Sequence, residues 1–340
     1  MISRYGENLK LSIFGASHAP EIGMTLEGIP AGLPVDLDSL QGFLNRRAPG
    51  QNDWSSPRKE ADVPHFESGL TNGFTNGDVL QAVIYNENVR KSDYDALKYV
   101  PRPGHADFAA WMKYGLEFDM SGGGHFSGRM TAPLCIAGGL CKQWLAEKGI
   151  QIDGWILQIG DVHSEGRTPV PNAQMLQRIQ QVQEEGNSLG GKIGCQISRV
   201  PAGLGDALFG GLESRLAAIL YSIPAVKAVS FGAGEAFAAM TGSQANDPFE
   251  LRNGCVQTTS NNCGGILGGI STGMPITFQV TIKPTPSIAK PQKSVNLRTM
   301  EEVSIEIQGR HDPCIVPRAV PVVEAAAAVA IFDMMLGEAV

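Results

Sequence analysis

The stretch GMTLEGIPAGL at residues 23–33 recurs as GCQISRVPAGL at residues 194–204. In both copies apolar and polar side chains alternate before the chain reaches Pro-Ala-Gly-Leu, which is the pattern of a half-buried strand that ends in a turn. The copies lie half a chain apart, which favours a duplication that produced two related halves, about residues 1–170 and 171–340, although two short matches also arise by chance. No linker separates the halves, so we expect one domain over residues 1–340.

Other segments show the same periodicities. Residues 11–14, 193–197 and 276–282 have the pattern of strands, and their alternation favours antiparallel sheet with one polar face. Helical patterns cover residues 132–148, 174–185, 212–222 and 321–336, and Pro321 is suited to the first turn of the last one. Strands and helices mix in both halves, which predicts an α+β fold made of layers of sheet and helix.

Composition limits the classes of partner. The chain has 340 residues, of which 43% are hydrophobic and 18% charged, so it can bury a large core. Its formal net charge of -7 argues against nucleic-acid and membrane-surface partners, and an anionic ligand must therefore meet a local basic cluster. The sequence has no uninterrupted run of about 18 apolar residues and no signal-peptide core at its start. We expect a soluble, cytoplasmic protein.

The six cysteines are scattered along the chain without any CxxC pair. This spacing indicates neither a zinc site nor a disulfide framework. Reduced and mostly buried thiols are the expected state, because a free cysteine usually packs as a small apolar side chain.

Three segments in the first half concentrate basic and hydrogen-bonding side chains. Residues 15–20 (GASHAP) put a hydroxyl and an imidazole in a loop after a strand. Residues 46–51 (RRAPGQ) set two arginines before a Pro-Gly turn, a charged run follows at 58–62 (RKEAD), and guanidinium groups suit phosphate and carboxylate. Residues 101–107 (PRPGHAD) hold an arginine and a histidine in a loop stiffened by prolines. A structural histidine, a solvated charge cluster and a plain turn are the respective alternatives.

Three further segments have comparable chemistry. Residues 121–129 (SGGGHFSGR) precede a helix start, where unpaired N–H groups bind anions, but their spacing is not that of a P-loop. Residues 261–273 (NNCGGILGGISTG) permit close approach of a flat ring and lead to phosphate donors in residues 283–287 (KPTPS). Residues 309–318 (GRHDPCIVPR) place a carboxylate beside cations. A plain turn, a packing contact and a salt-bridge cluster are the alternatives.

In order and spacing, these segments resemble the chorismate synthase family from Gly15 to Val323. The motifs that carry the resemblance are PRPGHAD at 101–107, KYG at 113–115, SIPAVK at 222–227, GGILGG at 264–269 and GRHDPC at 309–314. The resemblance implies a β-α-β sandwich, a homotetramer, reduced FMN as cofactor and NADPH only indirectly as reductant. It also implies a small anionic substrate, 5-enolpyruvylshikimate-3-phosphate, from which anti 1,4-elimination of phosphate gives chorismate.

Matching to the family motifs also assigns roles. His18 is the acid near the leaving phosphate, His105 protonates the reduced flavin, and Asp312 near the flavin N5 assists proton removal. The substrate-binding residues implied are Ser17, Arg47, Arg102, Ser127, Arg129 and Arg310. The flavin-binding residues implied are His125, Phe126, Ser127, Pro224, Ala225, Gly268, Lys283, Pro284, Thr285, Pro286, Ser287 and Arg310.

The chain departs from the family pattern at several positions. Ala16 and Ala19 flank the Ser-His pair where the family has Glu and Gly, and Ala48 replaces the third arginine of an Arg-rich run. His125 and Phe126 stand where the family has Arg and Ser. Two alternatives to the lyase therefore remain: a non-catalytic flavin- and anion-binding paralogue, and an enzyme acting on another phosphorylated enol ether. No dinucleotide fingerprint occurs, so an external reductant is expected.

Overall fold

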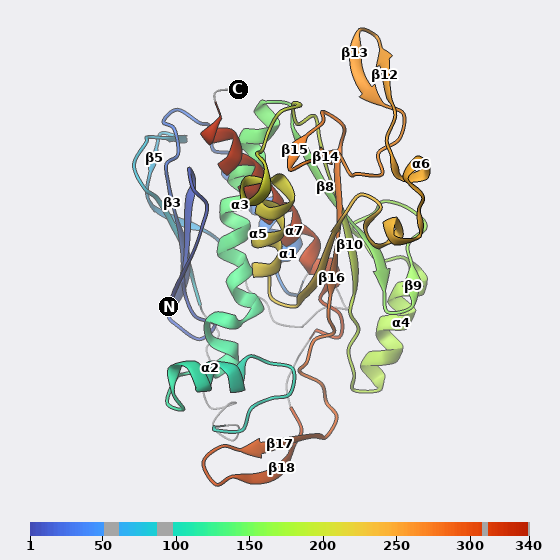
Figure 1. Ribbon diagram of the computed structural model, residues 1–340. Coiled ribbons are helices and arrows are strands. Elements are labelled where there is room, and N and C mark those ends of the chain that lie inside the picture. The colour runs from blue at the N-terminus through green and yellow to red at the C-terminus, as the bar shows by residue number, and fades with distance from the viewer. Residues whose placement is uncertain (51–60, 87–97, 308–311, 339–340) are drawn as a thin grey trace.

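The computed structural model describes residues 1–50, 61–86, 98–307 and 312–338. Two five-stranded antiparallel sheets face each other across a layer of helices, which is a β-α-β sandwich (Figure 1). The first sheet has the order β1 (Ile2–Tyr5), β2 (Lys10–Gly15), β3 (Glu21–Glu27), β7 (Leu80–Tyr85), β4 (His65–Ser68). The second has the order β11 (Val226–Phe231), β16 (Ile276–Ile282), β10 (Gly191–Ser198), β8 (Gln151–Ile159), β9 (Val162–His163).

The alternating strands behave as the sequence predicts. In β16 the four apolar side chains from Ile276 to Ile282 are buried, while the polar side chains between them are half-buried on the other face. The strand pairs antiparallel with β10 on one side and with β11 on the other. The α+β prediction and the strands expected at 11–14, 193–197 and 276–282 are confirmed.

Four helices fill the space between the sheets: α1 (Leu37–Arg47), α3 (Thr131–Glu147), α5 (Leu212–Ser222) and α7 (Val316–Gly337). Residues 212–222 form a helix as predicted, and α3 and α4 (Ala173–Glu184) begin and end within one residue of their predicted bounds. A free cysteine thiol is found at all six positions, and Cys135, Cys141, Cys195 and Cys314 are buried.

The prediction for the last helix needs one correction. Helix α7 begins at Val316, so Pro321 lies inside it and Pro317 occupies the first turn. By length and hydropathy α7 could cross a membrane, but 89% of its most apolar window is buried inside the protein. An all-round apolar helix is what the middle layer of a sandwich requires, since both faces of the helix contact other elements.

The repeated Pro-Ala-Gly-Leu turns have the same hydrogen bonds in both halves. The Thr75 hydroxyl donates to the Pro30 carbonyl at 2.7 Å and accepts from the Leu33 N–H at 2.9 Å. The Ser271 hydroxyl donates to the Pro201 carbonyl at 2.6 Å and accepts from the Leu204 N–H at 2.9 Å. This shared geometry supports the expected duplication.

Element order after each turn is also shared. A helix, a strand, a small hairpin and a return strand follow in both halves, and in the second half α6 (Gly242–Ala245) and a further hairpin at residues 249–258 are inserted after the strand. In the first half these are α1, β4, the hairpin of β5 (Leu70–Thr71) and β6 (Phe74–Thr75), and β7. In the second they are α5, β11, the hairpin of β14 (Ile266–Leu267) and β15 (Ile270–Ser271), and β16.

Smaller elements project from the sandwich. A lower lobe contains α2 (Asp107–Tyr114) and the hairpin of β17 (Gln292–Asn296) and β18 (Glu301–Ile305) (Figure 1). At the opposite end the hairpin of β12 (Phe249–Arg252) and β13 (Cys255–Thr258) extends beyond the body, next to α6 (Gly242–Ala245). Short 3-10 turns occur at Ser121–Phe126, Gly128–Met130, Leu208–Gly210 and Gly234–Ala239.

Close packing of α3 on α7 gives a test of the helix layer. A Cβ atom at Gly138 would overlap the backbone of Ala325, whereas a Cβ at Gly42 on the exposed side of α1 would meet nothing within 4 Å. We expect Gly138→Ala to lower the free energy of unfolding by about 1–3 kcal/mol through overpacking. Gly42→Ala, the matched control, should raise it by about 0.5–1 kcal/mol, because alanine loses less backbone entropy in a helix. Urea unfolding measures both, and equal effects would contradict this packing.

Candidate active site

The glycine loop at residues 121–126 lies directly on the Ser17-His18 pair. Gly122, Gly123 and Gly124 have φ angles of 61°, 88° and 57°, a region that residues with side chains rarely adopt. A Cβ at Gly122 would overlap the His18 imidazole, and the Ser17 N–H donates to the Gly124 carbonyl at 3.0 Å. The loop therefore holds His18, which is only 8% exposed, at the end of β2.

His125 in the same loop is bound to the protein on both ring nitrogens. Its Nδ1 lies 2.8 Å from the Gly15 carbonyl, so Nδ1 must carry the donated hydrogen. Its Nε2 lies 2.8 Å from the Ser3 hydroxyl of β1. His18 and His125 border one cavity of about 280 Å³, while Phe126 beside it is 39% exposed. His125, which stands where the family has arginine, therefore places an imidazole in this loop. Its two ring nitrogens anchor the loop to β1 and β2.

A buried cluster of charged groups forms beside this loop. Arg47, the last residue of α1, and Arg129, which follows the glycine loop, both form ion pairs with Asp62. Each arginine uses a different carboxylate oxygen, and the Asp62 side chain is fully buried. Arg47 Nε also donates to the Thr131 hydroxyl at 3.1 Å. Two guanidinium groups from distant parts of the chain therefore meet on one carboxylate.

Helix α7 extends the cluster from its first turns. Arg318 forms an ion pair with Asp312 and donates from Nε to the Arg47 carbonyl at 2.9 Å. Burial lowers the pKa of the Arg318 guanidinium, and Arg47 contributes in the same direction, although the Asp312 carboxylate opposes both. The group stays protonated, since arginine keeps its proton in proteins. Three cations and two carboxylates lie together among the described residues.

Asn86, at the end of β7, links the arginine cluster to the His18 loop. Its side-chain carbonyl accepts from Arg129 Nε at 3.2 Å, and its side-chain amide donates to the Ala19 carbonyl at 2.7 Å. Its backbone N–H donates to the Pro20 carbonyl at 2.9 Å. The histidine loop and the guanidinium pair are therefore held in one frame, which the sequence separation of these segments does not reveal.

Residues 101–107 form a second group with residues 283–287. His105 Nε2 lies 2.8 Å from the Ser287 hydroxyl, and Lys283 Nζ donates to the Gly104 carbonyl at 2.5 Å. Arg102 donates from Nε and Nη2 to the two carboxylate oxygens of Asp107, each at 2.7 Å. This bidentate pair fixes the loop at the start of α2, so Arg102 is held by a carboxylate of its own loop.

Residues 283–287 lie next to Ala225. The Lys283 N–H donates to the Ala225 carbonyl at 2.9 Å, and Ala225 has a φ of 76°. Burial lowers the pKa of the Lys283 amine, and the nearby charge of Lys227 lowers it further. The buried Thr285 hydroxyl oxygen has no hydrogen-bond partner among the described residues. An anion that contacts both the Lys283 amine and the Thr285 hydroxyl would satisfy both groups.

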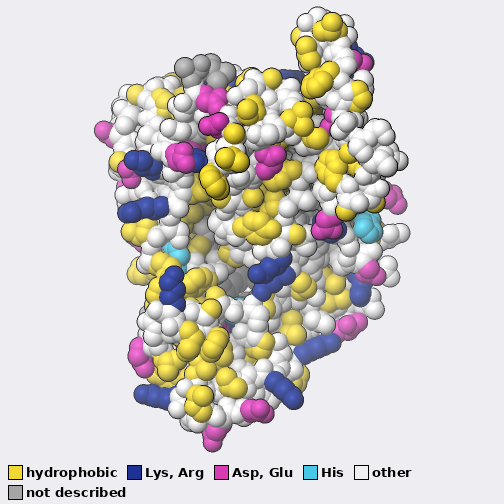
Figure 2. All heavy atoms as spheres, in the orientation of Figure 1, with side chains coloured by type: hydrophobic (Ala, Val, Ile, Leu, Met, Phe, Trp, Pro, Cys, Tyr) yellow, Lys and Arg dark blue, Asp and Glu magenta, His cyan; other side chains and the backbone are white. Residues whose placement is uncertain are grey.

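Backbone contacts join the two groups of residues. The Leu189 N–H donates to the carbonyl of Pro313, the neighbour of Asp312, at 2.8 Å. The adjacent Ser188 hydroxyl donates to the Thr285 carbonyl at 2.6 Å. Figure 2 shows a hollow between the sandwich and the lower lobe, with Lys and Arg side chains and a histidine along its rim. Residues 188 and 189 thus link the segment that contains Asp312 to residues 283–287.

One predicted residue that the structure describes, Gly268, does not join this assembly. Gly268 turns the β14–β15 hairpin, which lies beyond the other end of β16 from Lys283 (Figure 1). Arg310 lies outside the described residues. Ser127 starts the 3-10 turn that carries Arg129, and Pro224, Pro284 and Pro286 flank the Ala225 and Lys283 contacts in sequence.

Sequence reasoning missed Asp62, Asn86 and Arg318 as site residues. Asp62 and Arg318 each lie in a motif with other charged residues, but nothing in one dimension pairs them with Arg47 or Asp312. Asp62 has a φ of 48°, a left-handed conformation that Asp and Asn tolerate better than most residues. For Asp62 the signal in the sequence was its place at the end of the charged run at residues 58–62.

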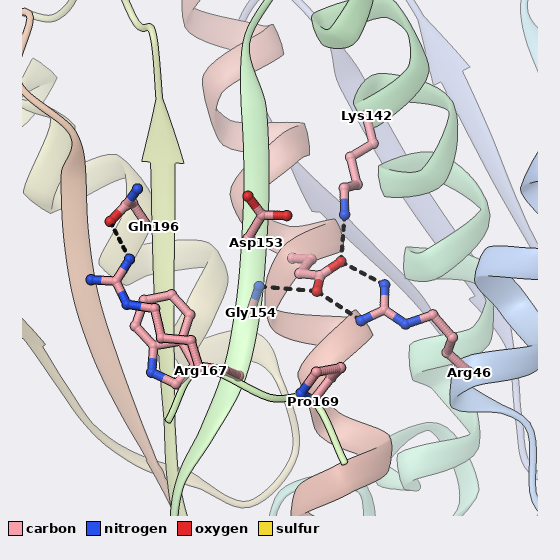
Figure 3. A pocket seen from close by; sticks show the side chains of 9 residues that line it. Arg46, Lys142, Asp153, Gly154, Arg167, Pro169 and Gln196 are labelled. Carbon is pink, nitrogen blue, oxygen red and sulfur yellow. Dashed lines mark hydrogen bonds and ion pairs between the residues drawn. The ribbon is translucent and has the colours of Figure 1, made fainter. Parts of the chain in front are cut away.

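A separate pocket of about 430 Å³ is lined by residues of α1, α3, α7, β8 and β10 (Figure 3). Arg46 donates from both terminal nitrogens to the buried Glu324 carboxylate at 2.8 Å, and Lys142 Nζ approaches the same carboxylate at 2.5 Å. The Gly154 N–H donates to it at 3.0 Å. The side chains of Arg46 and Arg47 therefore point in different directions, one toward Glu324 and one toward Asp62, as those of adjacent residues on one helix must.

The chain is similar over nearly its whole length to proteins of one family. The family model described as chorismate synthase matches residues 9–336. A chorismate synthase from Lancefieldella parvula is 46% identical over 98% of this chain and 96% of its own length. One from Korarchaeum cryptofilum is 42% identical over 98% of this chain and 97% of its own length. A crystal structure of chorismate synthase superposes with a TM-score of 0.76 at 27% identity, covering 98% of this chain and 92% of the other.

The Glu324 cluster predicts a specific acid response. Burial raises the pKa of this carboxyl, but the hydrogen bonds from Arg46 and the charge of Lys142 outweigh burial and hold the pKa below its ordinary value of 4.5. The stabilisation is therefore complete above about pH 4.5 and is lost as the pH falls through the lower pKa of the folded protein. We expect Glu324→Gln to lower the free energy of unfolding at pH 7 by about 1–3 kcal/mol and to flatten its dependence on pH below 4.5.

Urea unfolding between about pH 3.5 and pH 7, a range that includes the ordinary titration of glutamate, measures this response. The exposed Glu147→Gln variant is the control and should follow the wild type at every pH. An acid loss of stability as steep in Glu324→Gln as in the wild type would contradict this assignment.

Proposed function

Because the chain belongs to the chorismate synthase family, we propose that the arginine cluster and the two histidine loops are its active site. The protein is a lyase that removes phosphate from 5-enolpyruvylshikimate-3-phosphate to give chorismate. One observation carries the assignment of the site: Arg47 and Arg129 come from segments far apart in the chain and lie on the single buried carboxylate of Asp62.

Charge recognition explains the arginines. The substrate carries a phosphate and two carboxylates, whereas the whole chain has a formal net charge of -7. A local excess of cations is therefore required, and Arg47, Arg129 and Arg318 supply it against Asp62 and Asp312. Guanidinium groups bind such anions with paired N–H donors, and burial strengthens each contact because water screens it less.

Three residues are proposed to handle protons. His18 stands beside the glycine loop and is the acid near the departing phosphate. Asp312 is oriented by Arg318 and assists removal of the proton that the substrate loses. His105, held at 2.8 Å from the Ser287 hydroxyl, serves the cofactor side of the site. Each role needs a side chain of fixed orientation, and each of these residues is fixed by contacts with a different element.

Residues 283–287 fit the proposed cofactor, reduced FMN. The Thr285 hydroxyl is buried and has no partner among the described residues, and Lys283, two residues earlier in the same segment, supplies a positive charge. Such a pair suits the ligand's phosphate or ring oxygens. When bound, reduced flavin supplies electron density as the phosphate leaves. NADPH enters only indirectly, as a source of reducing equivalents.

The remaining proposals concern the setting of the enzyme. We propose a cytoplasmic homotetramer that takes a small anionic substrate and has neither a nucleic-acid nor a membrane partner. The buried position of α7 supports the proposal that this apolar helix is a core element. The net charge of -7 supports the absence of polyanionic partners.

Variants of the three proton-handling residues test the site. We expect His18→Ala and Asp312→Ala to lower kcat by about 100- to 10,000-fold, the usual contribution of a general acid or base, and His105→Ala to lower it by a similar factor. Substrate should still bind, since the arginine cluster remains. Chorismate formation measured anaerobically with chemically reduced FMN gives kcat, and calorimetry with substrate gives binding.

The exposed His163→Ala variant in β9 is the control and should keep the wild-type rate. Turnover of the wild type together with unchanged rates in all three variants would reject this site. Binding of substrate and FMN by the wild type without turnover would favour the non-catalytic paralogue instead, which the contacts of His125 with Gly15 and Ser3 make worth testing.

A further inference from the structure

We propose that Asp62 is a positioning residue that holds Arg47 and Arg129 together as one binding site for the anionic group of the substrate. The proposal rests on the function proposed above and adds a residue that acts through the two arginines. Asp62 occupies the space between them, and its two oxygens are divided so that one contacts each guanidinium group.

Burial makes this arrangement rigid. The Asp62 side chain is 0% exposed, Arg47 is 4% exposed and the Arg129 side chain is 8% exposed. Water therefore screens these charges little. Two guanidinium groups that are close enough to contact one carboxylate would repel each other if that carboxylate were absent. Asp62 offsets that repulsion before the ligand arrives, so binding does not have to supply the free energy of bringing two like charges together.

Each arginine also donates a hydrogen bond to a residue other than Asp62, and this second contact fixes its orientation. Arg47 Nε donates to the Thr131 hydroxyl at 3.1 Å, and Arg129 Nε donates to the Asn86 side-chain carbonyl at 3.2 Å. Among the described residues, Arg47 Nη2 has no hydrogen-bond partner, so it remains available to an anion. Each guanidinium group is held at Nε and at one terminal nitrogen, which orients its plane.

The charges of the cluster also require Asp62. Arg47, Arg129 and Arg318 face Asp62 and Asp312, which leaves one net positive charge among these described groups. Helix α7 contributes Arg318, whose Nε contacts the Arg47 carbonyl and so fixes the end of α1. The groups that face Asp62 in the ion pairs are therefore supplied by α1 and by the turn before α3, and Asp62 is the carboxylate that both of them contact.

Replacement of Asp62 by asparagine is the direct test. The asparagine side chain would keep one acceptor oxygen but would turn an amide toward the second guanidinium, so one arginine would lose its partner. We expect Asp62→Asn to raise KM for 5-enolpyruvylshikimate-3-phosphate at least about 10-fold and to change kcat less than about threefold, because the arginines bind ground state and transition state alike. Anaerobic steady-state kinetics with reduced FMN measures both constants. An unchanged KM, or a fall confined to kcat, would overturn the proposal.

The matched control is Asp333→Asn. Asp333 is also 0% exposed and also binds an arginine, Arg215, but it lies about 22 Å along α7 from Arg318 at 1.5 Å per residue. Its loss should lower the thermal midpoint while KM stays at the wild-type value. A rise in KM of the same size in Asp333→Asn would mean that loss of stability, rather than loss of arginine positioning, explains the Asp62 result.

A double-mutant cycle tests whether Asp62 acts through the arginines. If it does, Asp62→Asn should raise KM much less in an Arg129→Gln background than in the wild type, whereas independent effects would multiply and contradict the proposal. If Asp62→Asn does not fold, Thr131→Val removes the second contact of Arg47 together with the hydrogen bond from the Thr131 hydroxyl to the Gly128 carbonyl. It should raise KM about 2- to 13-fold, since a net hydrogen bond contributes about 0.5–1.5 kcal/mol and 1.4 kcal/mol is about tenfold. An unchanged KM in Thr131→Val would then reject the positioning of Arg47.

These outcomes separate the two proposals. A wild type that binds the substrate but forms no chorismate defeats the proposed function, and calorimetric titration of Asp62→Asn with the same substrate still tests positioning. A wild type that turns over beside an Asp62→Asn variant with normal KM defeats only the positioning role.

Discussion

Burial of helix α7 between two sheets is the constraint on which the rest of the structure depends. The helix is apolar on all sides, so it can be stable only where other elements cover it completely. The three charged residues on it each meet a partner of opposite charge: Arg318 meets Asp312, Glu324 meets Arg46 and Lys142, and Asp333 meets Arg215. Because an unpaired charge in this layer would be costly, these pairs also fix where the helix lies along its axis.

The candidate active site follows from the same arrangement. Arg318 lies in the first turns of α7, and its contact with the Arg47 carbonyl joins that helix to the end of α1. The adjacent residue Arg46 contacts Glu324 on the opposite side. One turn of α1 is therefore held to α7 from both sides, and this places Arg47 where Asp62 and Arg129 can meet it. The binding site uses the same ion pairs that position the helix layer.

A negatively charged protein thus presents a concentrated positive region to an anionic substrate. The formal net charge of the chain is -7, whereas Arg47 and Arg129 are buried, Arg318 is half-buried, and all three are paired with carboxylates. Pairing with Asp62 and Asp312 reduces the desolvation cost of the cations but leaves them in excess. The loops that complete the site come from both halves of the chain: the His18 and glycine loops from the first, and residues 283–287 from the second.

The sequence by itself determined the layers and much of the local chemistry. Alternation identified β16, helical periodicity identified α5, and the repeated Pro-Ala-Gly-Leu turns indicated related halves, because these patterns depend on neighbouring residues. The motifs also named His18, Arg47 and Asp312. The start of α7 was missed because Pro321 resembles a first-turn proline, yet tertiary burial keeps the helix intact through it. Only the tertiary structure decided that Asp62 joins Arg47 to Arg129, because an ion pair between distant segments depends on where the fold brings them and leaves no periodic mark in the chain.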